Sequence, residues 1–344
     1  MENNSTSPEF IVTNCSSDAI NAKNSRRHRL RMSLFLWARI LLTLSVLILL
    51  IATIKPQEIL AAFGSAKYPF VAMSLALLLP NLAIKALKWG YLLRQVKPQI
   101  SILEVVNTLL VGFTFGVVTP GQVGEFGRAF FISGRPRLEM IGLSFVEKLY
   151  NLLPIILGGS LGLLLLPGLV MDGNLYLFWS CCVLVLLLWA ALVLIVLSTR
   201  WIRDLLYAAN IMLPFREKTK ILLRALDPVG RKQSLVLAGL GMSHYIISVV
   251  QYFFLVSSFQ SVDFFAAIRA ATATLFVKAA LPISIGGLGV GETAAVAFFR
   301  IFEVSRAAAF NASVMLFSIN VLLPAILGLL VLVRLRIVPD EADD

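Results

Sequence analysis

Ionisable side chains stand at five places inside long apolar stretches of this 344-residue chain. The places are Glu125 with Arg128, Glu147 with Lys148, His244, Lys278, and Glu292. At the centre of a lipid bilayer each charge would cost about 2.5–3.5 kcal/mol on insertion scales, so each one needs a reason. Either these side chains line a polar cavity for a charged ligand, or they pair with one another inside a helix bundle. Glu125 and Arg128 lie three residues apart and are able to pair on one helix face.

The chemistry of these residue types suggests a charged ligand. Lysine and arginine attract phosphate, whereas the carboxylates would bind a cationic group, carry protons or hold the bases in place. We hypothesise that Glu125, Arg128 and Glu292 meet at one cavity. His244 is interpreted as the donor or acceptor of an interhelical hydrogen bond, and Lys278 as an amine able to snorkel to the interface.

Helical spacing adds a second polar face. Glu147, Tyr150 and Asn151 fall on one side of a helix and would line one face of the span that follows Arg128.

Glycine-rich breaks flank two of the charged places. The segment 120–125 reads PGQVGE, and the segment 287–292 reads GLGVGE. The residues of interest in these loops are Pro120, Gly121, Gly124, Gly286, Gly287, Gly289 and Gly291. They allow close backbone approach, and since no strand precedes either loop they do not indicate a nucleotide-binding turn. The sequence contains no catalytic or metal-binding motif, so we expect no cofactor, no metal and no enzymatic activity.

The composition identifies the setting of these residues as a membrane. Hydrophobic residues make up 58% of the chain and charged residues 14%, with a mean hydropathy of +0.87. These values lie far from those of soluble domains. The net charge of +11 comes from short basic clusters between apolar runs, which orient membrane spans and do not point to nucleic acid. The cysteines (Cys15, Cys181 and Cys182) indicate no disulfide framework.

Apolar runs long enough to cross a hydrocarbon core of about 30 Å define the spans. Six are expected, at 34–54, 69–93, 140–167, 175–198, 234–257 and 307–333. The last turns of the second run contain Lys85, Lys88, Trp89 and Tyr91, which are interpreted as an interfacial end with snorkelling amines and aromatic anchors.

Two further apolar segments break at the glycine-rich loops. Residues 102–118 and 264–281 are each followed by a short apolar segment, 126–134 and 293–302, which as a helix is only about 14–15 Å long. Such segments cannot cross alone, so we predict two re-entrant hairpins. The fold class is therefore an all-α integral membrane protein with about six spanning helices plus two oppositely oriented re-entrant helical hairpins.

Charge asymmetry orients this layout. The loop 199–232 is strongly basic, whereas the loops 168–174 and 258–263 contain no lysine or arginine. The positive-inside rule therefore predicts cytoplasmic termini, with the first hairpin entering from the cytoplasm and the second from outside. Opposed hairpins with a shared motif are typical of inverted repeats in transporters. The domains expected are a disordered basic tail (1–30), a transmembrane domain (31–337) and an acidic C-terminal tail (338–344).

Three segments together resemble the lysylphosphatidylglycerol synthase transmembrane-region family, also called flippase-like domain proteins. They are PGQVGE at 120–125 followed by Arg128, VEKL at 146–149, and PISIGGLGVGE at 282–292, and the resemblance extends over about residues 34–335. It implies an all-helical membrane fold that moves lipids between leaflets. It also implies lipid-headgroup or charge-relay contacts at Glu125, Arg128, Glu147 and Glu292.

The chain departs from the family pattern at two positions. Lys148 stands where the family usually has arginine, which removes a planar bidentate phosphate fork. Asn151 stands where the family usually has an acid, so an ion pair expected there is missing.

The resemblance favours a flippase or scramblase for an anionic phospholipid or a polyprenyl-phosphate-linked lipid, in the plasma membrane. We expect no fused soluble synthase domain, because the chain ends soon after the last apolar run. The expected partners are membrane lipids and a separately encoded lipid-modifying or glycosyl-transferring enzyme. Two alternatives stay open: an intramembrane transferase acting on lipid-linked substrates, and a non-catalytic partner of a lipid-modifying enzyme.

Overall fold

A computed structural model describes most of the helical part of the chain. The described residues are 66–119, 121–134, 136–167, 175–197, 229–282, 284 and 287–334, with a few isolated positions. Every regular element in these ranges is a helix, which confirms the all-α membrane class. The predicted first span, both tails, the loop 168–174 and nearly all of the loop 199–232 lie outside the described residues.

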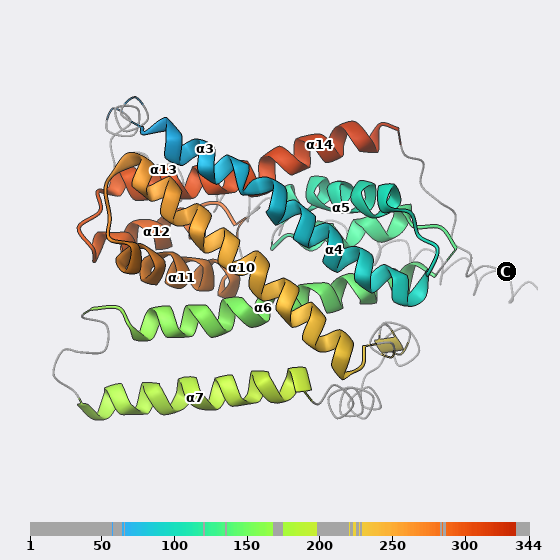
Figure 1. Cartoon of the computed structure of the whole chain (residues 1–344), viewed down its shortest axis with the longest axis horizontal. Helices are drawn as coiled ribbons and strands as arrows, with labels where there is room; N and C mark the ends of the chain where they lie inside the picture. The colour runs from blue at the N-terminus through green and yellow to red at the C-terminus, as the bar shows by residue number, and fades with distance from the viewer. Residues whose placement is uncertain are drawn as a thin grey trace, which may run out of the picture.

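Four helical stretches of 27–29 residues are long and apolar enough to cross a membrane. They are α3 (Tyr68–Ala76) continued by α4 (Leu78–Val96); α6 (Arg137–Leu164); α10 (Arg231–Phe259); and α13 (Arg306–Phe317) continued by the π-helix η2 (Ser318–Leu322) and α14 (Leu323–Leu332). A further apolar helix, α7 (Leu175–Leu197), lies beside α6 (Figure 1). Five of the six predicted spans therefore coincide with observed helices, and the sixth falls on undescribed residues.

Two helical hairpins complete the bundle. The first consists of α5 (Ile102–Val117) and the 3₁₀ helix η1 (Val123–Phe131), and the second of α11 (Phe264–Ala280) and α12 (Val290–Arg300). In each hairpin the second leg packs back on the first. The second legs are about 18 and 17 Å long, well short of a core of about 30 Å. The first return leg differs from expectation in being a tighter 3₁₀ helix.

The hairpins turn where the sequence supplies left-handed backbone. Gly121 and Gln122 have φ of 60° and 55° at the first tip, and Gly287 and Gly289 have φ of 80° and 85° at the second. This conformation is readily adopted by glycine. At the first tip the Thr119 hydroxyl also accepts a hydrogen bond of 2.6 Å from the Gly124 amide.

The tips of the two hairpins touch each other. In Figure 1, α5 lies toward one end of the bundle and α11 with α12 toward the other. The Gly121 amide donates a backbone hydrogen bond of 3.3 Å to the Ser284 carbonyl. A Cβ at Gly121 would lie 3.0 Å from Cβ of Pro282. The hairpins therefore approach from opposite ends and meet within the bundle, as the opposed arrangement predicts.

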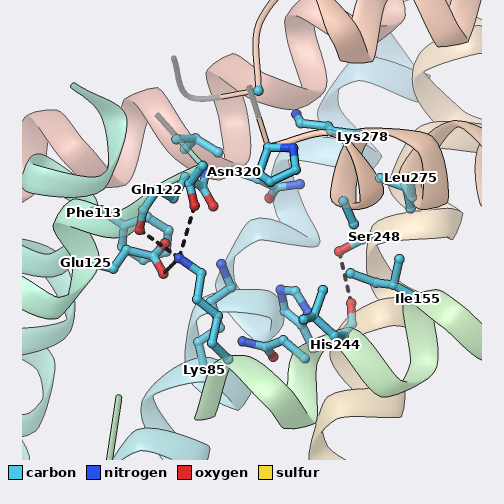
Figure 2. A pocket seen from close by; sticks show the side chains of 18 of the residues that line it. Lys85, Phe113, Gln122, Glu125, Ile155, His244, Ser248, Leu275, Lys278 and Asn320 are labelled. Carbon is cyan, nitrogen blue, oxygen red and sulfur yellow. Dashed lines mark hydrogen bonds and ion pairs between the residues drawn. The ribbon is translucent and has the colours of Figure 1, made fainter. Parts of the chain in front are cut away.

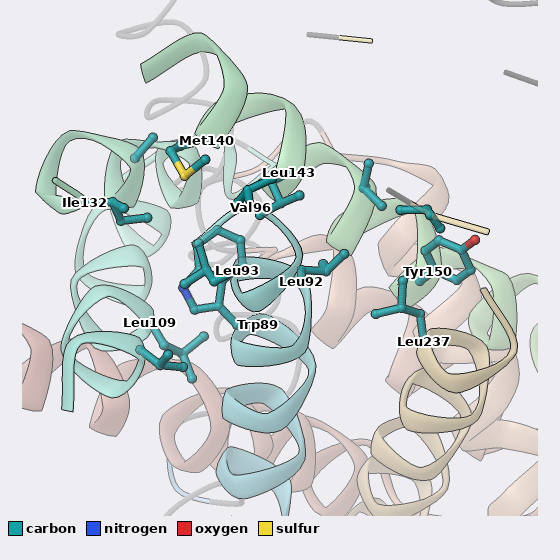
Figure 3. Packing of buried hydrophobic residues seen from close by; sticks show 14 of the residues in the cluster. Trp89, Leu92, Leu93, Val96, Leu109, Ile132, Met140, Leu143, Tyr150 and Leu237 are labelled. Atoms are coloured by element: carbon teal, nitrogen blue, oxygen red, sulfur yellow. The ribbon is translucent and has the colours of Figure 1, made fainter. Parts of the chain in front are cut away.

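Two apolar clusters hold the helices around this meeting point. One surrounds Trp89 and joins α4, α5 and α6 (Figure 3). The other is rich in alanine and joins α10–α13 around Tyr252 and Phe299, whose rings are 5.3 Å apart. The interfacial interpretation of Lys88 and Trp89 is wrong, because both are completely buried. Large exposed hydrophobic residues such as Leu79 lie on the outside, as expected for a surface that faces lipid.

Candidate functional site

A cavity of about 290 Å³ lies where the hairpin tips meet α4, α6, α10 and η2 (Figure 2). Its wall is partly apolar, with Phe113, Ile155 and Leu275 among the lining residues. Its polar lining consists of Lys85, Gln122, Glu125, Arg128, Glu147, Lys148, Asn151, His244, Ser248, Lys278, Ser284 and Asn320. Four of the predicted site residues, namely Glu125, Arg128, Glu147 and Lys148, are thus brought together.

Arg128 is fixed in place by three partners. Its side chain leaves η1 and is almost fully buried, at 4% exposure. The guanidinium stacks 3.5 Å from the ring centroid of Trp89, Nε donates to Ser144 Oγ at 3.0 Å, and Nη2 donates to the Glu147 carboxylate. Stacking plus a charge-assisted bond is an arrangement that arginine makes and lysine does not.

Glu147 is shared between two cations. Besides Arg128, it lies 3.7 Å from Nζ of Lys88, which also donates a hydrogen bond to Asn151 Oδ1. Asn151 therefore serves as a neutral acceptor for a buried lysine. The predicted common face of Glu147, Tyr150 and Asn151 is only partly correct, because the Tyr150 hydroxyl donates instead to Ser234 on α10, at 2.7 Å.

Lys148 holds the first hairpin tip. Its Nζ lies 3.3 Å from Glu125 Oε2 and donates to the Gln122 carbonyl at 2.7 Å and the Gly121 carbonyl at 3.3 Å. The expected pairing of Glu125 with Arg128 is wrong. Each instead pairs with α6, because η1 packs along that helix and Glu147 and Lys148 present the opposite charges there.

Glycines on α5 make room for the charged side chains of η1. A Cβ at Gly116 would lie 2.8 Å from Cγ of Glu125, and one at Gly112 would lie 3.3 Å from Cδ of Arg128. Gly112 and Gly116 therefore form a flat surface on α5, and the side chains of Arg128 and Glu125 pack across it. Small residues at this spacing allow such close packing in membrane helices.

Lys278 reaches the cavity from the second hairpin. Its side chain crosses Gly287 and Gly291, where an added Cβ would come within 2.4 and 3.2 Å of the lysine carbons. Nζ lies 5.8 Å from the Phe317 ring centroid. Within the described residues, it makes no hydrogen bond and no ion pair.

Lys85 and His244 also line the cavity, although the sequence indicated an interfacial amine for Lys85 and an interhelical hydrogen bond for His244. Lys85 Nζ faces the Phe113 ring at 4.4 Å, with no hydrogen bond or ion pair to any described residue. His244 lines the cavity, and over the same ranges its ring forms no hydrogen bond, so these residues do not supply the predicted interhelical partner. One signal was available: Asn81, Lys85 and Lys88 recur at intervals of four and three, which places a polar stripe on one face of α4.

Glu292 lies outside the cavity. It is completely buried in the first turn of α12. Its Oε2 accepts a hydrogen bond of 2.5 Å from the Gly289 amide, and its Oε1 accepts one of 3.1 Å from Ser313. This arrangement caps the helix, since a carboxylate satisfies an amide with no intrahelical partner. The structure therefore does not bring Glu292 together with Glu125 and Arg128.

Only some of the loop glycines that the structure describes line the cavity. Gly121 and Gly287 line the cavity, whereas Gly124 packs against the Phe115 carbonyl. Pro120 and Gly286 lie outside the described residues. Over the ranges given above, no three His, Cys, Asp or Glu side chains cluster in a way that would hold a metal ion.

Comparison with known proteins identifies the family of the chain. Residues 36–328 match the family described as lysylphosphatidylglycerol synthase TM region. Neither the curated proteins nor the solved structures include a match. Because the match covers most of the chain, including both hairpins and every residue of the cavity lining, the protein belongs to the lysylphosphatidylglycerol synthase transmembrane-region family.

Proposed function

We propose that this protein moves a phosphate-bearing membrane lipid between the two leaflets, as a flippase or scramblase. The observation that carries the proposal is the charged cavity enclosed by the tips of two opposed hairpins. Broken helices that meet inside a membrane bundle are the usual site of substrate binding in transporters, where one repeat moves against the other.

The size and lining of the cavity fit a headgroup and not a whole lipid. A volume of about 290 Å³ is at the lower end of the range of ligand sites, about 300–1,000 Å³. The lining contains four cationic and two acidic side chains, an excess of two positive charges. The helix surfaces beyond it expose leucines such as Leu79 and Leu184, so acyl chains would stay in the bilayer while the headgroup crosses.

The family match supports a role with membrane lipids. We place the protein in the plasma membrane with cytoplasmic termini, on the basis of the basic loop 199–232. The sequence has no ATP-binding motif. An ion gradient, the membrane potential or consumption of the lipid on the far side would supply the drive, the last with a separately encoded enzyme as partner.

Leaflet transfer in proteoliposomes tests the proposal. The full chain is reconstituted with fluorescent anionic phospholipid or polyprenyl phosphate in both leaflets, and an impermeant quencher reports how much label reaches the outer leaflet. Wild-type protein should raise the quenched fraction well above that of protein-free vesicles. No transfer of either lipid would overturn the proposal, and transfer by the protein alone would exclude an accessory role.

A variant pair locates the transfer at the cavity. Glu125→Gln removes the carboxylate from Lys148, loosening the first tip, and should slow transfer up to about fivefold, since a partly exposed ion pair contributes up to about 1 kcal/mol. Glu104→Gln, which breaks the similarly exposed pair with Lys97 outside the cavity lining, is the matched control and should transfer normally. Thermal unfolding of both variants separates loss of activity from loss of fold.

The transferase alternative ranks second. Such an enzyme needs a base beside a nucleophile, and His244, the cavity histidine, has no carboxylate hydrogen bond in the described part of the chain. Mass spectrometry of the lipids recovered from the transfer assay distinguishes the two, because a transferase would change their mass.

A further inference from the structure

The cations around the cavity fall into two groups by their partners. Arg128 is bound to Glu147, and Lys148 to Glu125 and two carbonyls of the first tip. Lys85 and Lys278 face the rings of Phe113 and Phe317 and, among the described residues, make no hydrogen bond or ion pair, although Glu125 and Glu147 act on Lys85 and Glu292 acts on Lys278 at longer range. The two unengaged ammonium groups therefore come from α4 and from the second hairpin, and both line the cavity (Figure 2).

The carboxylates of the cavity are already occupied. Glu147 is held between Arg128 and Lys88, and Glu125 is held by Lys148. A cationic headgroup entering the cavity would meet two unengaged ammonium groups and no unengaged carboxylate among the described lining residues. Like charges at close range repel, so such a headgroup is disfavoured.

The excess positive charge of the lining is two. Directly behind the wall, the buried Lys88 and Glu292 carry opposite charges and leave that excess unchanged. A phosphodiester carries one negative charge, whereas a phosphomonoester carries about −1.5 to −2 at neutral pH. The phosphomonoester also has more free oxygens for a donor such as the second amide hydrogen of Asn320, which lines the same cavity.

We propose that the cavity selects a lipid headgroup that ends in a phosphomonoester, with Lys85 and Lys278 as its cation contacts. Arg128 and Lys148 then act as positioning residues: Arg128 joins η1 to α6, and Lys148 secures the tip. This assignment rests on the proposed lipid transport and names the substrate class of the same site. It replaces the hypothesis that Arg128 attracts the phosphate, because the Arg128 guanidinium already has three partners.

Binding measurements on the detergent-solubilised full chain test the proposal apart from transport. Thermal-shift titrations compare short-chain phosphatidic acid, a phosphomonoester, with phosphatidylglycerol and phosphatidylethanolamine of the same chain length. We expect phosphatidic acid to bind about tenfold more tightly than either, the effect of one additional charge-assisted hydrogen bond. A fourth titration with inorganic phosphate shows whether the acyl chains contribute.

Variants identify the contacts. Lys85→Gln and Lys278→Gln should each weaken phosphatidic acid binding about tenfold and leave phosphatidylglycerol binding less affected. Lys85→Arg and Lys278→Arg should retain most of the affinity. The matched control is Lys67→Gln, which removes an exposed lysine before α3, at the end of the bundle away from the cavity lining, and should bind as the wild type does.

Each outcome decides one point. Equal wild-type affinity for the three lipids would overturn the proposal whether or not any variant folds, and so would glutamine variants that fold and bind normally. Inorganic phosphate binding as tightly as phosphatidic acid would assign the site to a soluble phosphate. Selective binding without leaflet transfer would leave this site standing and remove the transport function, and transfer without selectivity would do the reverse.

Discussion

Removal of the Glu147 carboxylate should destabilise the protein more than any other single charge change at the site. Glu147→Gln keeps the shape of the side chain but leaves Arg128 and Lys88, at 4% and 0% exposure, without their shared counter-charge. Breaking a buried ion pair from one side costs about 3–5 kcal/mol. In thermal unfolding of the detergent-solubilised chain, this loss of free energy corresponds to a melting temperature lower by about 6–20 °C.

A matched substitution and a charge-restoring double variant make the test specific. Glu104→Gln breaks a more exposed ion pair, 2.8 Å from Lys97, whose side chains are 26% and 24% exposed. It should cost no more than about 1 kcal/mol. Adding Lys88→Met to Glu147→Gln returns the buried group to its original net charge and should recover at least half of the lost stability. If Glu147→Gln costs no more than Glu104→Gln, the buried charge group does not stabilise the fold as argued.

Three further outcomes are expected. Gly124→Ala should lower the melting temperature by several degrees, because the added Cβ would lie 2.0 Å from the Phe115 carbonyl oxygen. The control is Gly239→Ala, whose Cβ would have no atom within 4 Å, and this substitution should leave the melting temperature unchanged or raise it slightly. Glu292→Gln should reduce thermal stability by about 1–3 kcal/mol through loss of the α12 cap, and its transfer rate per folded protein should stay near that of the wild type if Glu292 acts only as a cap. Single cysteines at Asn174 and Gln260 should label from outside in intact cells, and one at Lys218 should not; the reverse pattern would overturn the topology.

The helices and the hairpins were predictable because their signals are local. An apolar run of more than 20 residues and a Gly-rich break are both contained in one window of sequence, so α6 and α10 begin and end within a few residues of the predicted limits. The opposed entry of the hairpins followed from the distribution of basic residues along the chain. The structure agrees with it through the contact between Gly121 and Ser284.

The partners of the charges were not predictable in the same way. Lys88 bonds to Asn151, 63 residues away, and Arg128 bonds to Glu147, 19 residues away on another helix. Sequence spacing favoured Glu125 with Arg128 because it reports neighbours on one helix only. Which cations have partners, and therefore which are left to meet a ligand, depends on packing between helices. Lys85 illustrates this, since it lies three residues before Lys88 on the same helix, yet it faces the Phe113 ring of α5, whereas Lys88 contacts Asn151 and Glu147 of α6.

In both hairpins, charged side chains of one leg pack across glycines of the other, but the two legs exchange these roles. In the first, the glycines lie on α5 and the charged side chains that cross them lie on the return leg; in the second, Lys278 lies on the first leg and crosses glycines of the return leg. Glu125 and Glu292 hold the same place in the repeated motif, yet Glu125 is 25% exposed beside the cavity and Glu292 is completely buried as a cap. The first hairpin thus contributes paired charges to the cavity, and the second contributes a cation that has no hydrogen bond or ion pair among the residues that the structure describes. Repetition of the motif explains why both segments fold back, whereas the difference in charge between them is what makes the cavity suited to an anion.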